Sequence, residues 1–134
     1  MSKKIFINLP ISDLQKSMDF YAEIGFTNNP TFTDETAACM VLTEEIYVML
    51  LTHPKFSQFT NKEIIDAKKT AGVINSLSVD SIEEVNTMMT NAIKAGATEP
   101  RPAMDYGFMF QRSFEDIDGN LWEVFHMDVT KFPG

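Results

Sequence analysis

The sequence has little cysteine, little positive charge and no long apolar run. The single cysteine, Cys39, excludes an internal disulfide framework, which fits a reducing cytoplasm. No stretch approaches the roughly 18 consecutive apolar residues that a membrane-spanning helix needs, and the N-terminus lacks the apolar stretch of a signal peptide. We therefore expect a cytoplasmic protein without a membrane partner.

Basic residues are scarce: 11 Lys and Arg stand against 19 Asp and Glu, for a formal net charge of −8. Because a surface without a basic patch repels phosphate backbones, nucleic-acid binding is not expected. The 134 residues, 44% of them hydrophobic, are enough for one domain with its own core.

What the sequence does contain is a strand and a helix used twice. Residues 5–11 are typical of a strand, and Ser12 and Gln15 form a capping-box pattern at the start of a helix that Gly25 ends. The second copy has a strand at residues 73–79 and a helix that begins after Ser81. This repetition predicts duplication and a pseudo-twofold α+β fold.

Three strand candidates follow each helix. They are residues 26–32, 36–43 and 46–52 in the first half, and 98–103, 107–115 and 120–127 in the second. The order is therefore βαβββ twice, with module one at about 1–52 and module two at about 72–134. The linker, 53–71, contains a predicted short helix at 61–69. It could be a packed connection, a flap over a ligand site or a subunit contact.

The opening run 8–14 with Phe20-Tyr21 and Gly25-Phe26, together with the closing run 116–123, resembles the vicinal-oxygen-chelate superfamily. That superfamily includes glyoxalase I, extradiol dioxygenases, fosfomycin-resistance enzymes and bleomycin-binding proteins, and the resemblance is closest to a bacterial branch labelled "predicted lactoylglutathione lyase". It implies two modules that form a cup-shaped, barrel-like mixed sheet around a small-molecule site. It also implies a homodimer.

The resemblance also implies where metal ligands would lie. The four family positions fall at Phe6, Met49, Ile74 and Glu123, and Glu123 alone retains a metal-binding side chain. A one-residue slip would place Asn8 or Asn75 at the first-strand positions, and neither is a good transition-metal ligand. No metal cofactor is therefore expected, although a divalent metal stays an alternative.

The last two predicted strands place two opposite charges on an aromatic surface. If Asp116–Gly119 is the loop, Arg112 lies opposite Glu123, and Phe110 shares their face. The two charges would either neutralise each other or anchor a ligand, with Arg112 offering its planar fork to an oxygen-rich group. Arg112 and Glu123 are the candidate catalytic residues.

The remaining candidates are ligand-binding residues that would line the cup: Phe6, Asn8, Met49, Ser76, Tyr106 and Phe110. The predicted function is a small-molecule site in an aromatic cup without a catalytic transition metal. Two alternatives stay open, a metal-dependent lyase, isomerase or dioxygenase and a metal-free protein that sequesters an antibiotic-like molecule. A metal-free enzyme with Glu123 as general base lies between them.

Overall fold

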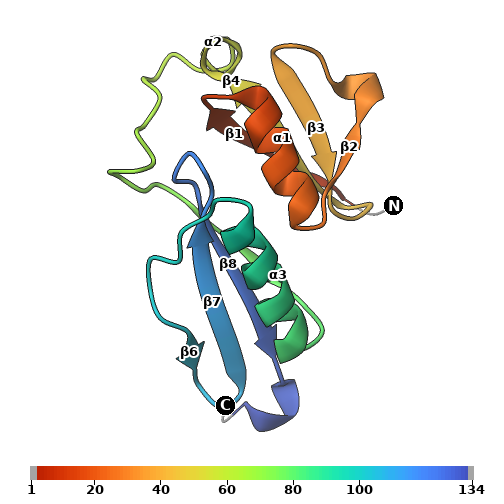
Figure 1. The fold of residues 1–134 in the computed structure, drawn as a ribbon, viewed down its shortest axis with the longest axis vertical. Helices are drawn as coiled ribbons and strands as arrows, with labels where there is room; N and C mark the ends of the chain where they lie inside the picture. Colours follow the sequence, from red (N-terminus) through yellow and green to blue (C-terminus); the bar gives the residue numbers. More distant parts are fainter. Residues whose placement is uncertain (1–2, 133–134) are drawn as a thin grey trace. The chain divides into compact units, whose positions relative to one another are not determined.

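The computed structural model describes residues 3–132, which contain two βαβββ modules in succession (Figure 1). The chain divides into two compact units, Met1–Asp66 and Ala67–Gly134, so the boundary lies within the predicted linker. Strands of the described residues form two separate four-stranded sheets, one in each unit, and no closed barrel. The predicted α+β fold with its repeated element order is confirmed.

Module one has the sheet order β1-β4-β3-β2. Its elements are β1 (Ile5–Ile11), α1 (Leu14–Glu23), β2 (Thr27–Asn29), β3 (Ala37–Val41) and β4 (Ile46–Thr52). Strand β1 runs parallel to β4, and the other pairs are antiparallel. Helix α1 covers one face of the sheet, where Phe20 and Tyr21 are buried with Val48 and Leu50. The opposite face carries the side chains of the alternate residues.

Module two repeats this plan with the order β5-β8-β7-β6. Its elements are β5 (Ile74–Ser78), α3 (Ile82–Lys94), β6 (Met104–Asp105), β7 (Met109–Glu115) and β8 (Leu121–Met127). Helix α3 lies along the sheet (Figure 1) and packs on β7 and β8. Phe114, Trp122 and Val124 on that face are at most 1% exposed. Full burial of each such side chain contributes about 1.5–3 kcal/mol.

The two helix starts differ, although the sequence predicts the same capping box for both. Ser81 caps α3 as predicted, and its Oγ accepts the N–H of Glu84 at 3.0 Å. For α1 the predicted cap, Ser12, is wrong: Asp13 has the extended cap conformation, and its carboxylate accepts the N–H of Lys16 at 3.1 Å. Asp caps a helix as well as Ser does, so the helix starts one residue later.

The connection between the modules also departs from prediction. Its helix is α2 (His53–Phe56), and residues 57–73 contain no helix or strand, so the predicted helix at 61–69 is wrong. Pro54 at the first turn suits a helix start, because its fixed φ is already helical. A short helix needs an apolar face to bury, and Ile65 stays 52% exposed.

Of the predicted strands, one forms only in part and another does not form. The run 26–32 forms β2 only to Asn29, since Pro30 begins a 3-10 turn, Pro30–Phe32. The run 98–103 is not a strand, apart from an isolated bridge between Thr98 and Glu115. Helices within residues 3–132 are all too short or too polar to cross a bilayer.

Candidate functional site

The β7–β8 hairpin decides which side chains share a face in module two. Ser113 pairs with Glu123, and Arg112 pairs with Val124. The predicted pairing of Arg112 with Glu123 is therefore wrong by one residue, and a slip of one residue moves a side chain to the other face. Phe110, which pairs with His126, likewise lies on the face of Arg112 and not on that of Glu123.

The shift comes from the loop between the strands. The N–H of Asp116 bonds to the carbonyl of Asn120 at 2.9 Å, which leaves three residues in the turn instead of four. The buried Asp116 carboxylate accepts N–H groups from Asp118 at 2.9 Å and Asn120 at 2.8 Å. Gly119 supplies the positive φ, +92°, that a three-residue hairpin loop needs at its last position.

Glu123 lies on the face of the sheet that α3 does not cover. Its carboxylate accepts the hydroxyl of Ser76 at 2.8 Å and the side-chain amide of Gln111 at 3.4 Å. Ser113 lies directly opposite it. No cation among residues 3–132 lies within ion-pair distance of this carboxylate. Glu123 thus carries a half-buried negative charge that has hydrogen-bond partners but no ionic partner among the described residues.

Arg112 makes its side-chain hydrogen bonds on the other side of the sheet, toward Glu99 and α3. Its Nε and Nη2 donate to the Glu99 carboxylate at 2.9 and 2.7 Å, and its Nη1 donates to Asn86 of α3 at 2.9 Å. Hydrogen bonds from Arg112 lower the pKa of Glu99, and the same contact raises the pKa of Arg112. Bidentate pairing of this kind fixes both groups in place.

A cavity lies beside β7 because its neighbour on that edge is interrupted. Thr98 bridges to Glu115 and Met104 pairs with Gln111, so the five residues 99–103 lie opposite the three residues 112–114. Pro100 and Pro102 in this bulge have no N–H to donate to a ladder, which explains why the predicted strand fails. The extra residues bow outward and leave space at the sheet edge.

The cavity measures about 80 Å³. It brings together three of the predicted site residues, Glu123, Arg112 and Tyr106, and the last of these is 49% exposed. Sequence reasoning missed the other lining residues, because their positions depend either on the bulge and the strand that follows it or on the register of β7 against β8. They are Arg101, Pro102, Met104, Gln111 and Ser113.

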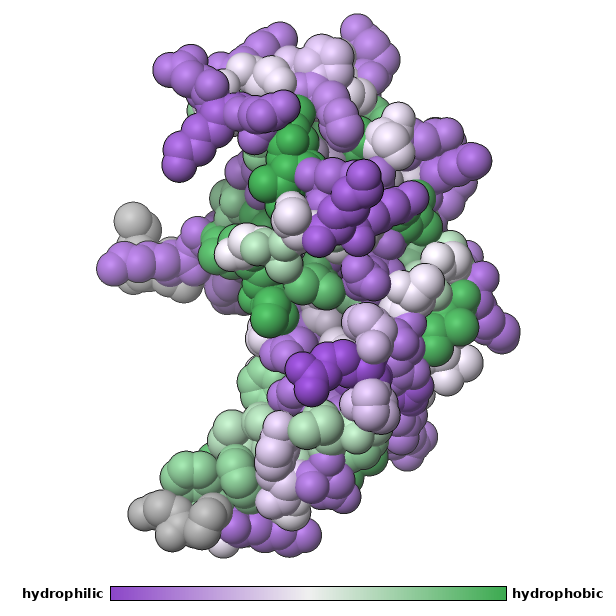
Figure 2. Space-filling view, turned by 90° about the vertical axis from the view of Figure 1, so that its left-hand side faces the viewer, coloured by the Kyte–Doolittle hydropathy of each residue, from purple (hydrophilic) through white to green (hydrophobic). Residues whose placement is uncertain are grey.

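Module one has its own open face, opposite α1. Phe6 stacks on Tyr47 with 4.3 Å between ring centroids and an interplanar angle of 11°. Asn8 pairs with Met49 on the same face, so the structure brings three predicted ligand-binding residues together. Tyr47 was missed, although strand alternation places it two residues before Met49 on that face. Phe6 is 49% exposed. Exposed apolar residues also occur elsewhere, and the surface view in Figure 2 shows them among hydrophilic ones.

The residues at the four positions where the resemblance implies metal ligands do not fit a catalytic metal. Phe6, Met49 and Ile74 offer a phenyl ring, a thioether and an alkyl chain, and only Glu123 offers a hard oxygen donor. That carboxylate already accepts hydrogen bonds from Ser76 and Gln111. Among residues 3–132, no three His, Cys, Asp or Glu side chains gather closely enough to hold a metal ion. Three such donors are the usual minimum for a catalytic site.

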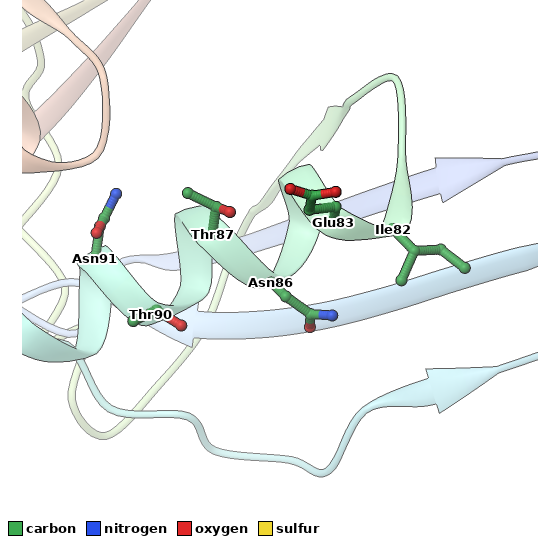
Figure 3. A pocket seen from close by; sticks show the side chains of 6 residues that line it. All are labelled: Ile82, Glu83, Asn86, Thr87, Thr90 and Asn91. Atoms are coloured by element: carbon green, nitrogen blue, oxygen red, sulfur yellow. The ribbon is translucent and has the colours of Figure 1, made fainter.

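A second hollow, of about 500 Å³, runs along the outer side of α3. Figure 3 displays its six lining residues, and all of them come from this single helix. The lining includes none of the predicted site residues. They are Ile82, Glu83, Asn86, Thr87, Thr90 and Asn91. An open groove formed by one helix encloses a ligand poorly, so we place the candidate site at the sheet and its edge cavity.

Comparison with known proteins agrees with the resemblance in the sequence. Residues 3–42 match the family described as bleomycin resistance protein-like N-terminal. No protein of a curated collection matches the sequence significantly.

Solved structures share the fold over almost the whole chain. A glyoxalase/bleomycin resistance protein/dioxygenase family enzyme from Burkholderia phytofirmans has a TM-score of 0.76 at 18% identity, covering 94% of this chain and 99% of its own. A glyoxalase-related enzyme from Fulvimarina pelagi has 0.78 at 20%, with coverages of 94% and 88%. The fosfomycin resistance protein FosX from Mesorhizobium loti has 0.70 at 11%, with coverages of 97% and 96%. The chain therefore has the fold of these glyoxalase/bleomycin resistance protein/dioxygenase structures, and its residues 3–42 are similar to a bleomycin resistance protein-like N-terminal segment.

Proposed function

We propose that the chain binds a small organic molecule on the open face of the module-two sheet, and that it does so without a catalytic transition metal. The observation that carries the proposal is the Glu123 carboxylate. It is half-buried on an open sheet face, it is held by the hydroxyl of Ser76 and the amide of Gln111, and it has no cationic partner among residues 3–132.

The chemistry of the site favours a ligand with a cationic or hydrogen-bond-donating group. An uncompensated carboxylate attracts such a group, and the net charge of −8 strengthens this preference. Leu121 and Phe125 flank Glu123 on the same face of β8 and are partly exposed, so they offer apolar contact to the rest of the ligand. The site thus suits an amphipathic molecule with an aromatic or aliphatic body.

Glu123 is also the group that could act in catalysis. A carboxylate fixed by two donors and open to solution can accept a proton from a bound substrate, which is general-base catalysis. Arg112, the other candidate catalytic residue, makes no hydrogen bond or ion pair with Glu123, because its guanidinium is bound to Glu99 and Asn86. The family-model description and the names of the structural relatives include both resistance proteins and enzymes. Binding is therefore the proposed function, with turnover a further step.

The experiment is a titration of ¹⁵N-labelled, chelator-treated protein with phenethylamine, which combines an aromatic ring with an ammonium group. We expect saturable shifts of the Gln111, Ser113 and Glu123 amides, and at least tenfold weaker binding in Glu123→Gln. The matched control is Glu83→Gln, which removes the same charge from an exposed position on α3.

Two results would overturn the proposal. One is equal phenethylamine affinity in the Glu123→Gln and Glu83→Gln proteins. The other is near-stoichiometric binding of Zn²⁺, Ni²⁺, Fe²⁺ or Mn²⁺ that Glu123→Ala abolishes, which would restore a metal-dependent lyase or dioxygenase.

A further inference from the structure

Arg101 is the second arginine in the wall of the edge cavity, and its state differs from that of Arg112. The guanidinium of Arg112 is bound to Glu99 and Asn86. That of Arg101 is exposed and makes no hydrogen bond or ion pair with any residue from 3 to 132. The bulge at residues 99–103 carries Arg101 to the cavity, so its position is a consequence of the interrupted strand.

Two of the charged side chains in the cavity wall therefore have no ionic partner among residues 3–132. Arg112 and Glu99 neutralise each other, which leaves the positive charge of Arg101 and the negative charge of Glu123 without ionic partners. Gln111 and Ser113 add polar groups to the same wall. A volume of about 80 Å³ corresponds to roughly three water molecules. The cavity can thus hold only the polar end of a ligand, and that end can contact both Arg101 and Glu123.

We propose that this cavity recognises a carboxylate that lies next to a hydrogen-bond donor or an ammonium group, as in an α-amino or α-hydroxy acid. The planar fork of Arg101 matches a carboxylate, and Glu123 accepts the donor. The inference rests on the proposed function, since it assigns a ligand class to the site that contains Glu123. Arg101 is then the residue that determines specificity for the acid group.

Three probes with the same aromatic body test this assignment. They are L-phenylalanine, phenethylamine, which lacks the carboxylate, and 3-phenylpropanoate, which lacks the ammonium group. Amide shifts of ¹⁵N-labelled full-length protein give the dissociation constants. We expect L-phenylalanine to bind about tenfold more tightly than phenethylamine, because a charge-assisted bidentate contact is added. We expect 3-phenylpropanoate to be weaker than L-phenylalanine by a similar factor.

Variants of Arg101 test whether this residue causes the tighter binding of L-phenylalanine. In Arg101→Gln the advantage of L-phenylalanine over phenethylamine should vanish because L-phenylalanine binds more weakly, while phenethylamine, which has no carboxylate, should lose no affinity. Arg101→Lys should retain part of the advantage, because it keeps the charge and loses the fork. Lys16→Gln, which removes an exposed positive charge from α1, is the control and should change nothing.

The inference and the proposed function fail in different ways. If phenethylamine binds through Glu123 but L-phenylalanine binds no more tightly, the carboxylate assignment is wrong and the proposed function stands. If the advantage persists in Arg101→Gln, Arg101 is not the residue responsible. If phenethylamine binding is unaffected by Glu123→Gln, the proposed function itself is wrong.

Discussion

Arg112 and Glu99 form a two-pronged ion pair, with Nε to Oε2 at 2.9 Å and Nη2 to Oε1 at 2.7 Å. Arg112 belongs to β7, and Glu99 belongs to the bulge beside that strand. The third contact of Arg112, to Asn86 at 2.9 Å, reaches α3. One guanidinium thus connects the sheet, the bulge and the helix, and it fixes the wall of the cavity.

The first prediction concerns acid stability. Arg112 hydrogen bonds lower the pKa of Glu99 below its ordinary value of 4.5. The stabilisation is therefore fully present above about pH 4.5 and is lost as the pH falls through the lowered pKa. Because both side chains are about one-fifth exposed, we expect a loss of about 1 kcal/mol. Urea unfolding at pH 3–7 of the wild type and Glu99→Gln measures it, and the variant should lack this part of the pH dependence.

The second prediction distinguishes Glu99, which is the ionic partner of Arg112 in the structure, from Glu123, which the sequence predicted. A double-mutant cycle of Arg112→Gln with Glu99→Gln should give a coupling free energy of about 1 kcal/mol. The cycle of Arg112→Gln with Glu123→Gln should be additive within about 0.3 kcal/mol, because the two side chains make no hydrogen bond or ion pair with each other and share no hydrogen-bond partner. Strong coupling in the second cycle would contradict the β7–β8 register in which Arg112 pairs with Val124.

Much of the fold is predictable because it depends on local patterns. The strands 5–11 and 46–52 have the predicted bounds, since a short, mostly apolar run between polar or turn residues marks a strand well. Ser81 was correctly identified as a cap for the same local reason. The repeat of one such pattern then predicts the second module from the first.

The site was less predictable because it depends on contacts between distant residues. The register of Glu123 is set by buried hydrogen bonds between Asp116 and Asn120, and no count of loop residues reveals them. The cavity at Arg101 depends on Pro100 and Pro102, which look like ordinary loop residues unless their strand partner is known. A one-residue error was therefore enough to attribute the wrong partner to Arg112.

The third prediction concerns Cys39, which is 3% exposed in β3. Burial raises the pKa of its thiol, so little thiolate forms at pH 8, and reagents also lack access. We expect labelling by a disulfide reagent in native buffer to be at least a hundredfold slower than in 6 M guanidinium. Rapid labelling of the native protein would show that β3 opens readily.

The last prediction compares three glycines. Gly119 has a φ of +92°, and a Cβ there would lie 2.7 Å from the backbone of Ala67 and Lys68. Gly107 has a φ of +84° with open space around it, and Gly72 has open space without a positive φ. Gly107→Ala should therefore lower the free energy of unfolding by about 1–2 kcal/mol, because alanine disfavours the left-handed conformation. Gly72→Ala should be close to neutral.

Gly119→Ala should be the most destabilising of the three, at about 3 kcal/mol or more, because the backbone of residues 67–68 or the hairpin must also shift. Urea unfolding of the three variants gives the order, and amide shifts of residues 66–69 report the displacement directly. Equal losses of stability for Gly119→Ala and Gly107→Ala would mean that only the backbone conformation matters and that the backbone of residues 67–68 does not pack tightly against the hairpin. The expected difference between them would show that the turn that sets the register of Glu123 is also held from outside by the segment at the start of the second unit.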